Sequence, residues 1–204
     1  MKLHYFAGAP NPRKVRIYLA EKGIENVEIV SVNLLAGEHR TPEFRKKNPW
    51  AALPVLELDD GTCRSESLAI IEYLEELHPD PPMIGTTPEE RLRVRGLERM
   101  CDGSVLFRIG TIAQNSHPFF ASRLKQSAEA AANARKVLGA ALRLLDAEIG
   151  DRPFVAGDRP TIADCTLFAA LAFANLLQLG VDLDEAPHVR RFYADFEQRK
   201  SANA

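Results

Sequence analysis

The chain has 204 residues, of which 46% are hydrophobic and 26% charged, a composition typical of a soluble globular protein with a sizeable core. Its 26 basic and 28 acidic residues leave a formal net charge of −2, which excludes the strong basic field used by general nucleic-acid binders. Nucleic acid is therefore not an expected partner.

No segment predicts export or membrane insertion. Residues 1–6 lack the long apolar region and cleavage site of a signal peptide. Residues 166–179, the most apolar stretch, are too short to span a bilayer and predict a buried helix. The three cysteines are far apart, without metal-ligand or redox spacing, at Cys63, Cys101 and Cys165. We expect a cytoplasmic protein with reduced thiols, no metal site and no membrane partner.

Strand-like and helix-like segments alternate along the first part of the chain. We predict strands at residues 3–6, 27–32, 53–58 and 62–64, and helices at residues 13–22, from Thr41 onward and at 66–77. Asp59-Asp60-Gly61 predicts a hairpin between the last two strands. Ile70, Leu74 and Leu77 lie at i, i+4 and i+7, the spacing of an amphipathic helix. The predicted order is βαβαββα.

A break in composition follows these elements. The proline-containing residues 79–87 cannot sustain a helix and predict a linker. Beyond the linker the strand signals end, and apolar residues recur at helical spacing. Strands followed by helices imply two packed units rather than one α/β sheet. We therefore expect one domain at residues 1–78 and an all-helical domain at residues 88–204.

Two short segments carry the most specific information. Leu53-Pro54-Val55 opens a predicted strand with a proline, which cannot donate a hydrogen bond to a sheet and belongs at a strand end or edge. Ser65-Glu66-Ser67 stands at the start of the helix predicted at 66–77, and the free amides of a helix start form a ready carboxylate site. The simpler interpretation is that Ser65 or Ser67 only caps that helix.

In this order the two segments resemble the glutathione transferase family, and the resemblance covers nearly the whole chain. It implies an N-terminal thioredoxin-like, glutathione-binding domain followed by an all-helical domain. Leu53, Pro54 and Val55 resemble the family's cis-proline strand, in which the Val55 backbone would pair with the cysteinyl part of glutathione. Glu66 and Ser67 match the family's acidic-serine pair, which holds the γ-glutamyl end.

The helical half contains a second point of resemblance. Residues 155–164 are similar to the family's capping segment before its central buried helix. Thr161 and Asp164 stand at the spacing of an N-cap and its N3 partner, an acidic variant of the capping box. We expect this segment to stabilise the fold by about 0.5–2 kcal/mol per cap.

A free thiol with a pKa of about 8.5 is mostly protonated at neutral pH, so glutathione needs a hydrogen-bond donor beside its sulfur. Family members that use serine or threonine place it where this chain has Ala9, and those that use cysteine place it at Pro10. Tyr5 stands at the position of the catalytic tyrosine of other classes, although strand aromatics more often belong to the core. Ala9-Pro10-Asn11 resembles the Thr-Pro-Asn turn of the bacterial Nu-like class. Asn11 is therefore the favoured donor, with simple helix capping as its alternative role.

Three further residues are candidate glutathione ligands. His39 and Arg40 resemble a loop of Theta-like members that reaches the glycyl carboxylate, although residues of polar loops are often only solvated. Asp102 resembles acids that cross a dimer interface toward the partner's γ-glutamyl group. Trp50-Ala51-Ala52 departs from the family pattern, because many relatives place a lysine or glutamine there.

An apolar pocket for a second substrate is expected between the two domains. Its candidate residues are Phe6, Ala7, Cys101, Asp102, Phe107, Arg108 and residues 115–120.

The resemblance implies a homodimeric glutathione transferase that uses glutathione as cosubstrate. It would conjugate glutathione to small electrophiles, or use it to reduce a peroxide or a disulfide. The alternative is a non-catalytic binding or regulatory protein on the same fold. The missing hydroxyl at Ala9 favours the alternative, whereas Pro54 and Glu66-Ser67 favour retained glutathione binding.

Overall fold

A four-stranded mixed sheet organises the N-terminal half of the chain in a computed structural model that describes all 204 residues. The strands are β1 (Lys2–Tyr5), β2 (Glu28–Ser31), β3 (Val55–Glu57) and β4 (Cys63–Ser65), in the spatial order β2-β1-β3-β4. β2 runs parallel to β1, whereas β3 is antiparallel to both β1 and β4. The predicted order βαβαββα is confirmed, with the last strand beginning one residue later than expected.

The hairpin between β3 and β4 forms as the turn residues predict. Leu58 donates its N–H to the Thr62 carbonyl at 2.8 Å, and the Asp60 carboxylate accepts the Thr62 N–H at 2.8 Å. Gly61 adopts a φ of 84°, a left-handed conformation that glycine reaches without steric cost. The hairpin holds the start of β3 beside the end of β4.

Helix α1 (Pro10–Lys22) begins three residues before the predicted start at residue 13. Pro10 and Pro12 both fit in its first turn, because the amides there have no partner within the helix. The N-cap residue is Ala9, which has no side-chain oxygen, and Gly23 ends the helix with a φ of 67°. The interpretation of Asn11 as an N-cap is therefore wrong: it lies inside the first turn.

Two other helices complete this half. α2 (Pro42–Lys47) follows a 3-10 turn at Glu38–Arg40 and is capped as predicted, with the Thr41 hydroxyl accepting the Phe44 N–H at 3.3 Å. α3 (Ser67–Leu77) has Glu66 at its N-cap with a φ of 71°, and no side chain caps it. The expectation that Ser65 or Ser67 caps α3 is therefore also wrong, because Ser67 is already the first helical residue and its hydroxyl bonds elsewhere.

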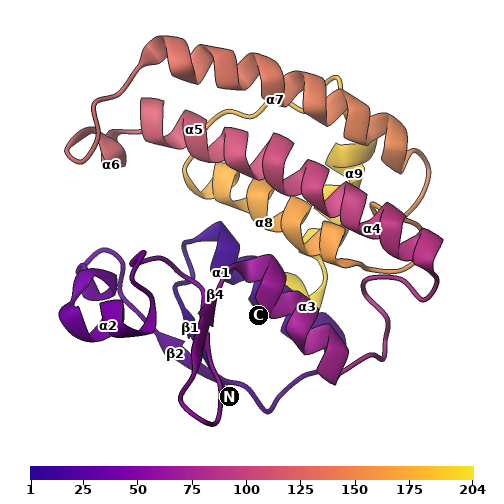
Figure 1. The fold of residues 1–204 in the computed structure, drawn as a ribbon. Helices are drawn as coiled ribbons and strands as arrows, with labels where there is room; N and C mark the ends of the chain where they lie inside the picture. The colour runs from indigo at the N-terminus through magenta and orange to yellow at the C-terminus, as the bar shows by residue number, and fades with distance from the viewer.

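The remainder of the chain is helical and packs above the sheet-containing half (Figure 1). The elements are α4 (Pro88–Met100), a π-helical turn (Cys101–Leu106), α5 (Phe107–Ser116), α6 (Pro118–Ala121), α7 (Ala128–Ile149), α8 (Ile162–Leu176), α9 (Pro187–Glu197) and a 3-10 turn (Lys200–Asn203). None of the helices combines the length and apolar character needed to cross a bilayer.

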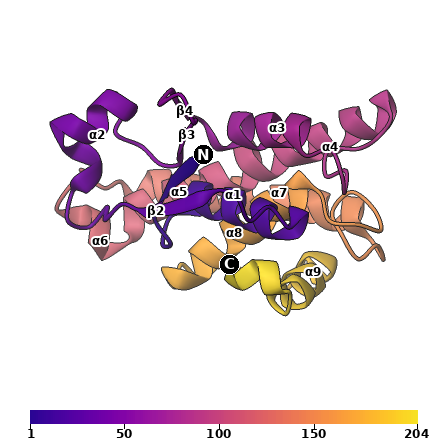
Figure 2. The same ribbon diagram turned by 90° about the horizontal axis from the view of Figure 1, so that it is seen from below.

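α8 forms the centre of the helical half, as the apolar run at 166–179 predicts. Almost every residue from Ile162 to Ala174 is buried, and α1 packs against this helix (Figures 1 and 2). The predicted capping segment is confirmed: Asp164 Oδ2 accepts the Thr161 N–H and hydroxyl, each at 2.7 Å. Its Oδ1 accepts the Val155 N–H at 2.8 Å. These bonds fix the loop before α8 onto the helix start.

The chain end is tied back to the first helix. Arg199 forms two hydrogen bonds of 2.7 Å to the Glu21 carboxylate, and the Ser201 hydroxyl bonds to the same group. The Arg13 guanidinium donates to the Ala202 carbonyl at 3.0 Å. In the view from below, the C-terminal turn lies next to α1 and α9 (Figure 2). The two halves are therefore joined at this end as well as through the linker.

Candidate functional site

Three segments that are distant in sequence meet at one corner of the N-terminal half. The Leu53–Pro54 peptide bond is cis and immediately precedes β3. Because Val55 pairs with Ser65 in the antiparallel hairpin, Pro54 lies opposite Glu66 at the start of α3. The Ser67 hydroxyl donates to Asn11 Oδ1 at 3.4 Å, which brings the first turn of α1 to the same point. The structure thus groups Pro54, Glu66, Ser67 and Asn11.

The free backbone at this corner belongs to Leu53 rather than to Val55. Val55 pairs with His4 on one side and Ser65 on the other, inside the sheet. No hydrogen bond within the chain uses the N–H or C=O of Leu53. A main chain that lies half-exposed with both groups free can pair with an extended peptide, as an exposed sheet edge does.

Asn11 and Tyr5, the two candidate thiolate donors, have different surroundings. Asn11 is exposed, and because its Oδ1 accepts from Ser67, its amide N–H₂ remains free to donate. Tyr5 ends β1, where burial raises the pKa of its hydroxyl, and the Arg16 guanidinium lies 5.5 Å from its ring centroid. Tyr5 lines neither of the clefts described below. Asn11 thus contacts Ser67 directly and lines one cleft, whereas Tyr5 forms no side-chain hydrogen bond with any of the grouped residues.

Asp102 reaches the same region from the helical half. It lies in the π-helical turn, where it accepts from Lys14 Nζ at 2.9 Å and from Arg99 at 3.0 Å. Lys14 is almost fully buried and also lies 3.7 Å from the buried Glu98. π-helical turns interrupt the regular register of a helix and often occur at functional sites. In this protein the turn directs Asp102 toward α1 within the same chain.

His39 and Arg40 lie in the 3-10 turn before α2. Arg40 Nε donates to His39 Nε2 at 3.2 Å, which leaves the ring proton on Nδ1, a buried atom without a hydrogen-bond partner. Burial, followed by the charges of Arg40, Arg123 and Arg45, lowers the pKa of His39. The ring is therefore neutral at physiological pH and has a donor to offer.

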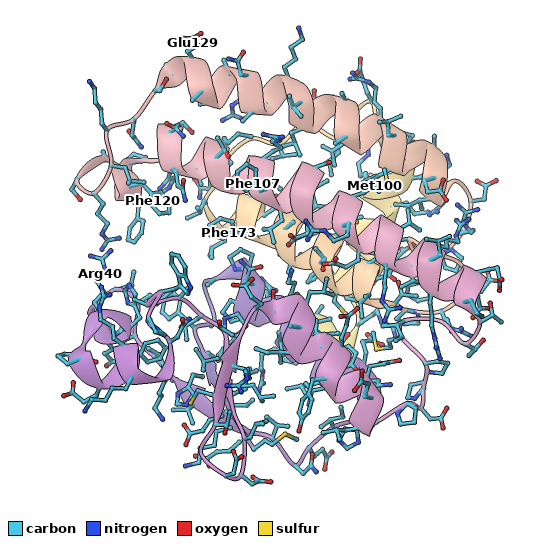
Figure 3. All side chains as sticks on the ribbon, in the orientation of Figure 1. Arg40, Met100, Phe107, Phe120, Glu129 and Phe173 are labelled. Carbon is cyan, nitrogen blue, oxygen red and sulfur yellow. The ribbon has the colours of Figure 1, made fainter.

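Two adjoining clefts lie between the two halves, next to this corner. The first, of about 360 Å³, is lined by residues that include Asn11, Asp102, Phe107, Gly110 and Thr111. The second, of about 460 Å³, includes Phe6, His39, Arg40, Phe119 and Arg123. Pro10, Gln114, Phe120 and Phe173 line both. Figure 3 shows Phe120 and Phe173 on the helical half and Arg40 at the facing edge of the N-terminal half.

The residues predicted to line a pocket between the two halves are partly correct. Phe6, Phe107, Phe119 and Phe120 line the clefts as expected, whereas Cys101 is fully buried behind them. Ala7, Arg108 and Asn115 line neither cleft. Sequence reasoning missed Phe173, which is hidden in the apolar pattern of α8, and Arg123, an ordinary loop arginine without a motif.

A third hollow, of about 310 Å³, lies near the linker, away from these residues. Gly85, Glu90 and Arg159 are among the residues that line it, and the last two form an exposed ion pair of 3.1 Å. Thr161 and residues 156–159 of the capping segment line it, but none of the predicted glutathione ligands does.

Comparisons with known proteins agree with the geometry. Residues 3–82 match the family described as Glutathione S-transferase, N-terminal domain, and residues 128–195 match Glutathione S-transferase, C-terminal domain. Glutathione S-transferase 2 of Saccharomyces cerevisiae is 35% identical over 94% of this chain and 83% of its own length. Maleylacetoacetate isomerase of Pseudomonas aeruginosa is 34% identical over 94% of this chain and 88% of its own length.

Solved structures extend the similarity to three dimensions. The crystal structure of Gtt2 from Saccharomyces cerevisiae has a TM-score of 0.89 at 34% identity, covering 100% of this chain and 99% of the other. A glutathione S-transferase of Methylobacterium radiotolerans in complex with glutathione sulfonate has a TM-score of 0.82 at 29% identity, covering 99% and 92%. The predicted fold class, a thioredoxin-like domain followed by an all-helical domain, is confirmed.

The buried ion pairs of Lys14 generate a prediction about stability. Replacing Lys14 with Met leaves Glu98 buried without its cation, which costs about 3–5 kcal/mol in the free energy of unfolding. Burial already raises the pKa of Glu98, while Lys14 opposes that rise. Without Lys14 the pKa of Glu98 rises further, so the deficit grows as the pH rises from the ordinary value of a glutamate toward the raised pKa of the folded state and levels off above it. Urea unfolding at pH 5 and pH 8 measures both effects.

A double variant supplies the control for this prediction. Adding Glu98→Gln to Lys14→Met removes the unpaired charge and keeps an acceptor for the Thr166 hydroxyl, which bonds Glu98 at 3.1 Å. We expect the double variant to recover most of the lost stability. Wild-type stability in Lys14→Met alone would show that these pairs do not hold the halves together.

Proposed function

Because the chain belongs to the glutathione S-transferase family, we propose that it binds glutathione where Pro54, Ser67 and Asn11 meet and transfers the thiol to a small electrophile, or uses it to reduce a peroxide or a disulfide. Glutathione is the cosubstrate of the family. The observation that carries the proposal is the Asn11–Ser67 contact of 3.4 Å, which joins the helix starts of α1 and α3 beside the cis-proline.

Each end of glutathione has a proposed partner at this corner. Glu66 and Ser67 hold the γ-glutamyl end, with the first amides of α3 facing its carboxylate. The free N–H and C=O of Leu53 support Leu53, rather than Val55, as the backbone that pairs with the cysteinyl residue. Arg40 and the neutral His39 receive the glycyl carboxylate at the other end of the peptide.

The proposed thiolate donor is Asn11. Its amide cannot act as a base, but its free N–H₂ can donate to the sulfur and lower the thiol pKa. The start of α1 adds the positive end of a helix dipole. The thiolate then attacks the electrophile, while the protein supplies binding, orientation and electrostatic stabilisation.

The choice among conjugation, reduction and related reactions is a separate question. Two relatives of nearly equal identity are named as a glutathione transferase and as maleylacetoacetate isomerase, so membership of the family does not select the reaction. The apolar lining of both clefts favours an electrophile with an aromatic or aliphatic body.

The site assignment predicts that glutathione binding depends on Glu66 and Ser67. Glu66→Ala and Ser67→Ala each remove a hydrogen-bonding group that faces a charged ligand, an interaction worth about 1.5–3 kcal/mol, or roughly a 10- to 150-fold weaker Kd. Calorimetric titration with glutathione measures the change, and Ser65→Ala serves as the neighbouring control with unchanged affinity. Wild-type affinity in both test variants would remove this assignment.

The thiolate donor is tested by comparing Asn11→Ala with Tyr5→Phe. A hydrogen bond to a charged sulfur that contributes about 1.4 kcal/mol corresponds to tenfold in rate, so Asn11→Ala lowers kcat/KM about tenfold. Tyr5→Phe changes it little, because the Tyr5 hydroxyl does not line either cleft. The assay is conjugation of 1-chloro-2,4-dinitrobenzene.

Two other results would change this assignment. If Tyr5→Phe abolishes turnover while Asn11→Ala leaves kcat/KM unchanged, Tyr5 is the donor. If wild type shows no glutathione-dependent turnover with electrophiles, peroxides or disulfides, the non-catalytic alternative is favoured instead.

We further propose that the protein acts as a cytoplasmic homodimer. Trp50, 86% exposed, and Leu92, 77% exposed, are large apolar side chains without cover in the single chain. Light scattering at micromolar concentration should give about twice the chain mass of 22.6 kDa. A mass equal to one chain would contradict the dimer and, with it, the role of Asp102 toward a partner's glutathione.

A further inference from the structure

The larger cleft carries permanent positive charge and no acidic side chain. Arg40 enters it from the N-terminal half and Arg123 from the loop after α6 in the helical half. None of the residues that line this cleft is an aspartate or a glutamate. Figure 3 shows Arg40 at the edge of the N-terminal half, below the α6 segment that carries Phe120.

Neither arginine is neutralised within the chain. Arg40 donates to the uncharged His39, and the Arg123 guanidinium lies 4.3 Å from the centroid of the Phe119 ring. By contrast, Arg95 pairs with Glu72 at 2.8 Å and Arg99 with Asp102 at 3.0 Å. Two uncompensated cations in one cleft form an attractive site for an anion, and a guanidinium is suited to bind a carboxylate through two hydrogen bonds.

The charge of Arg123 acts across the cleft. Burial lowers the pKa of His39 on the opposite wall, and the charges of Arg40, Arg123 and Arg45 add to this effect. The stacking on Phe119 orients the guanidinium and keeps its edges free for hydrogen bonds. Arg123 is therefore held near the cationic end of the cleft before any ligand binds.

The remaining walls define the body of the ligand. Phe6 and Leu35 from one half face Phe119, Phe120 and Phe173 from the other. A cleft with an aromatic body and a cationic end matches a flat apolar molecule with a carboxylate at one end.

Two carboxylates can therefore be accommodated. In the proposed function the glycyl carboxylate of glutathione pairs with Arg40 and His39, and Arg123 then remains unpaired. We propose that Arg123 binds a carboxylate of the second substrate, so that the preferred electrophiles are aromatic or apolar molecules that bear a carboxylate. This inference rests on the proposed function for the position of glutathione.

A matched pair of electrophiles tests the inference. 4-Isothiocyanatobenzoate and its methyl ester react in the same way: the thiolate sulfur bonds to the isothiocyanate carbon, and the nitrogen takes up a proton to give a dithiocarbamate. Each kcat/KM is divided by the rate constant with glutathione alone, which removes the difference in intrinsic reactivity. For wild type, this corrected kcat/KM should be roughly tenfold or more higher for the acid than for the ester.

Substitution of Arg123 separates charge recognition from general effects. Arg123→Gln should lower kcat/KM for the acid roughly tenfold and leave the ester unchanged. Lys125→Gln is the matched control, since it removes an exposed cation from the same loop that does not line the cleft. We expect Lys125→Gln to alter neither reaction.

A binding measurement decides the inference independently of turnover. With glutathione present at saturation, calorimetry should show that 4-nitrobenzoate binds wild type at least tenfold more tightly than methyl 4-nitrobenzoate, and that Arg123→Gln removes the difference. Equal binding of the acid and the ester by wild type would overturn the inference.

The two proposals fail in different ways. Equal kcat/KM for acid and ester in wild type overturns the carboxylate preference while the transferase function stands. If Arg123→Gln raises the KM for glutathione and leaves the KM for both electrophiles unchanged, Arg123 binds the glycyl carboxylate. This result also overturns the carboxylate preference. Absence of turnover with both electrophiles counts against the proposed function, and the calorimetric result then decides the carboxylate site alone.

Discussion

Burial of α1 on two sides is the constraint from which the rest of the arrangement follows. One side packs against α3 and the sheet and the other against α8, so that Val15, Ile17 and Tyr18 are completely enclosed. Polar side chains on such a helix must be paired, because an unpaired buried charge is costly. The pairs reach across the chain: Arg13 to Ala202, Lys14 to Glu98 and Asp102, Glu21 to Arg199, and Lys22 to Glu75 and Pro81. One helix thereby positions both halves, the linker and the C-terminus.

The site depends on this arrangement because the first turn of α1 lies where the two clefts meet. Pro10 lines both clefts, and the neighbouring Asn11 contacts Ser67. The clefts differ in charge: the acid in one, Asp102, is neutralised by Lys14, whereas Arg40 and Arg123 in the other have no counter-charge. This difference in charge favours an anionic ligand in the larger cleft only.

Local signals in the sequence predicted most of the fold. The β3–β4 hairpin, the Thr41 cap and the Thr161–Asp164 cap each depend on residues within a few positions of one another. The errors have local causes too. Two prolines fit in the first turn of α1, so the helix begins before Asn11, and the φ of 71° at Glu66 starts α3 without a side-chain cap.

By itself, the sequence determined the element order, the family and the candidate glutathione ligands, because motifs of a few residues carry that information. Only the tertiary structure decided which candidates meet. Asn11 and Ser67 are 56 positions apart and Lys14 and Asp102 are 88 apart, and both contacts arise from helix packing. The free backbone of Leu53 and the placement of Arg123 and His39 in one cleft likewise have no sequence pattern. Contacts between distant segments depend on how whole helices and strands pack against one another, and the spacing of residues along the chain does not predict that packing.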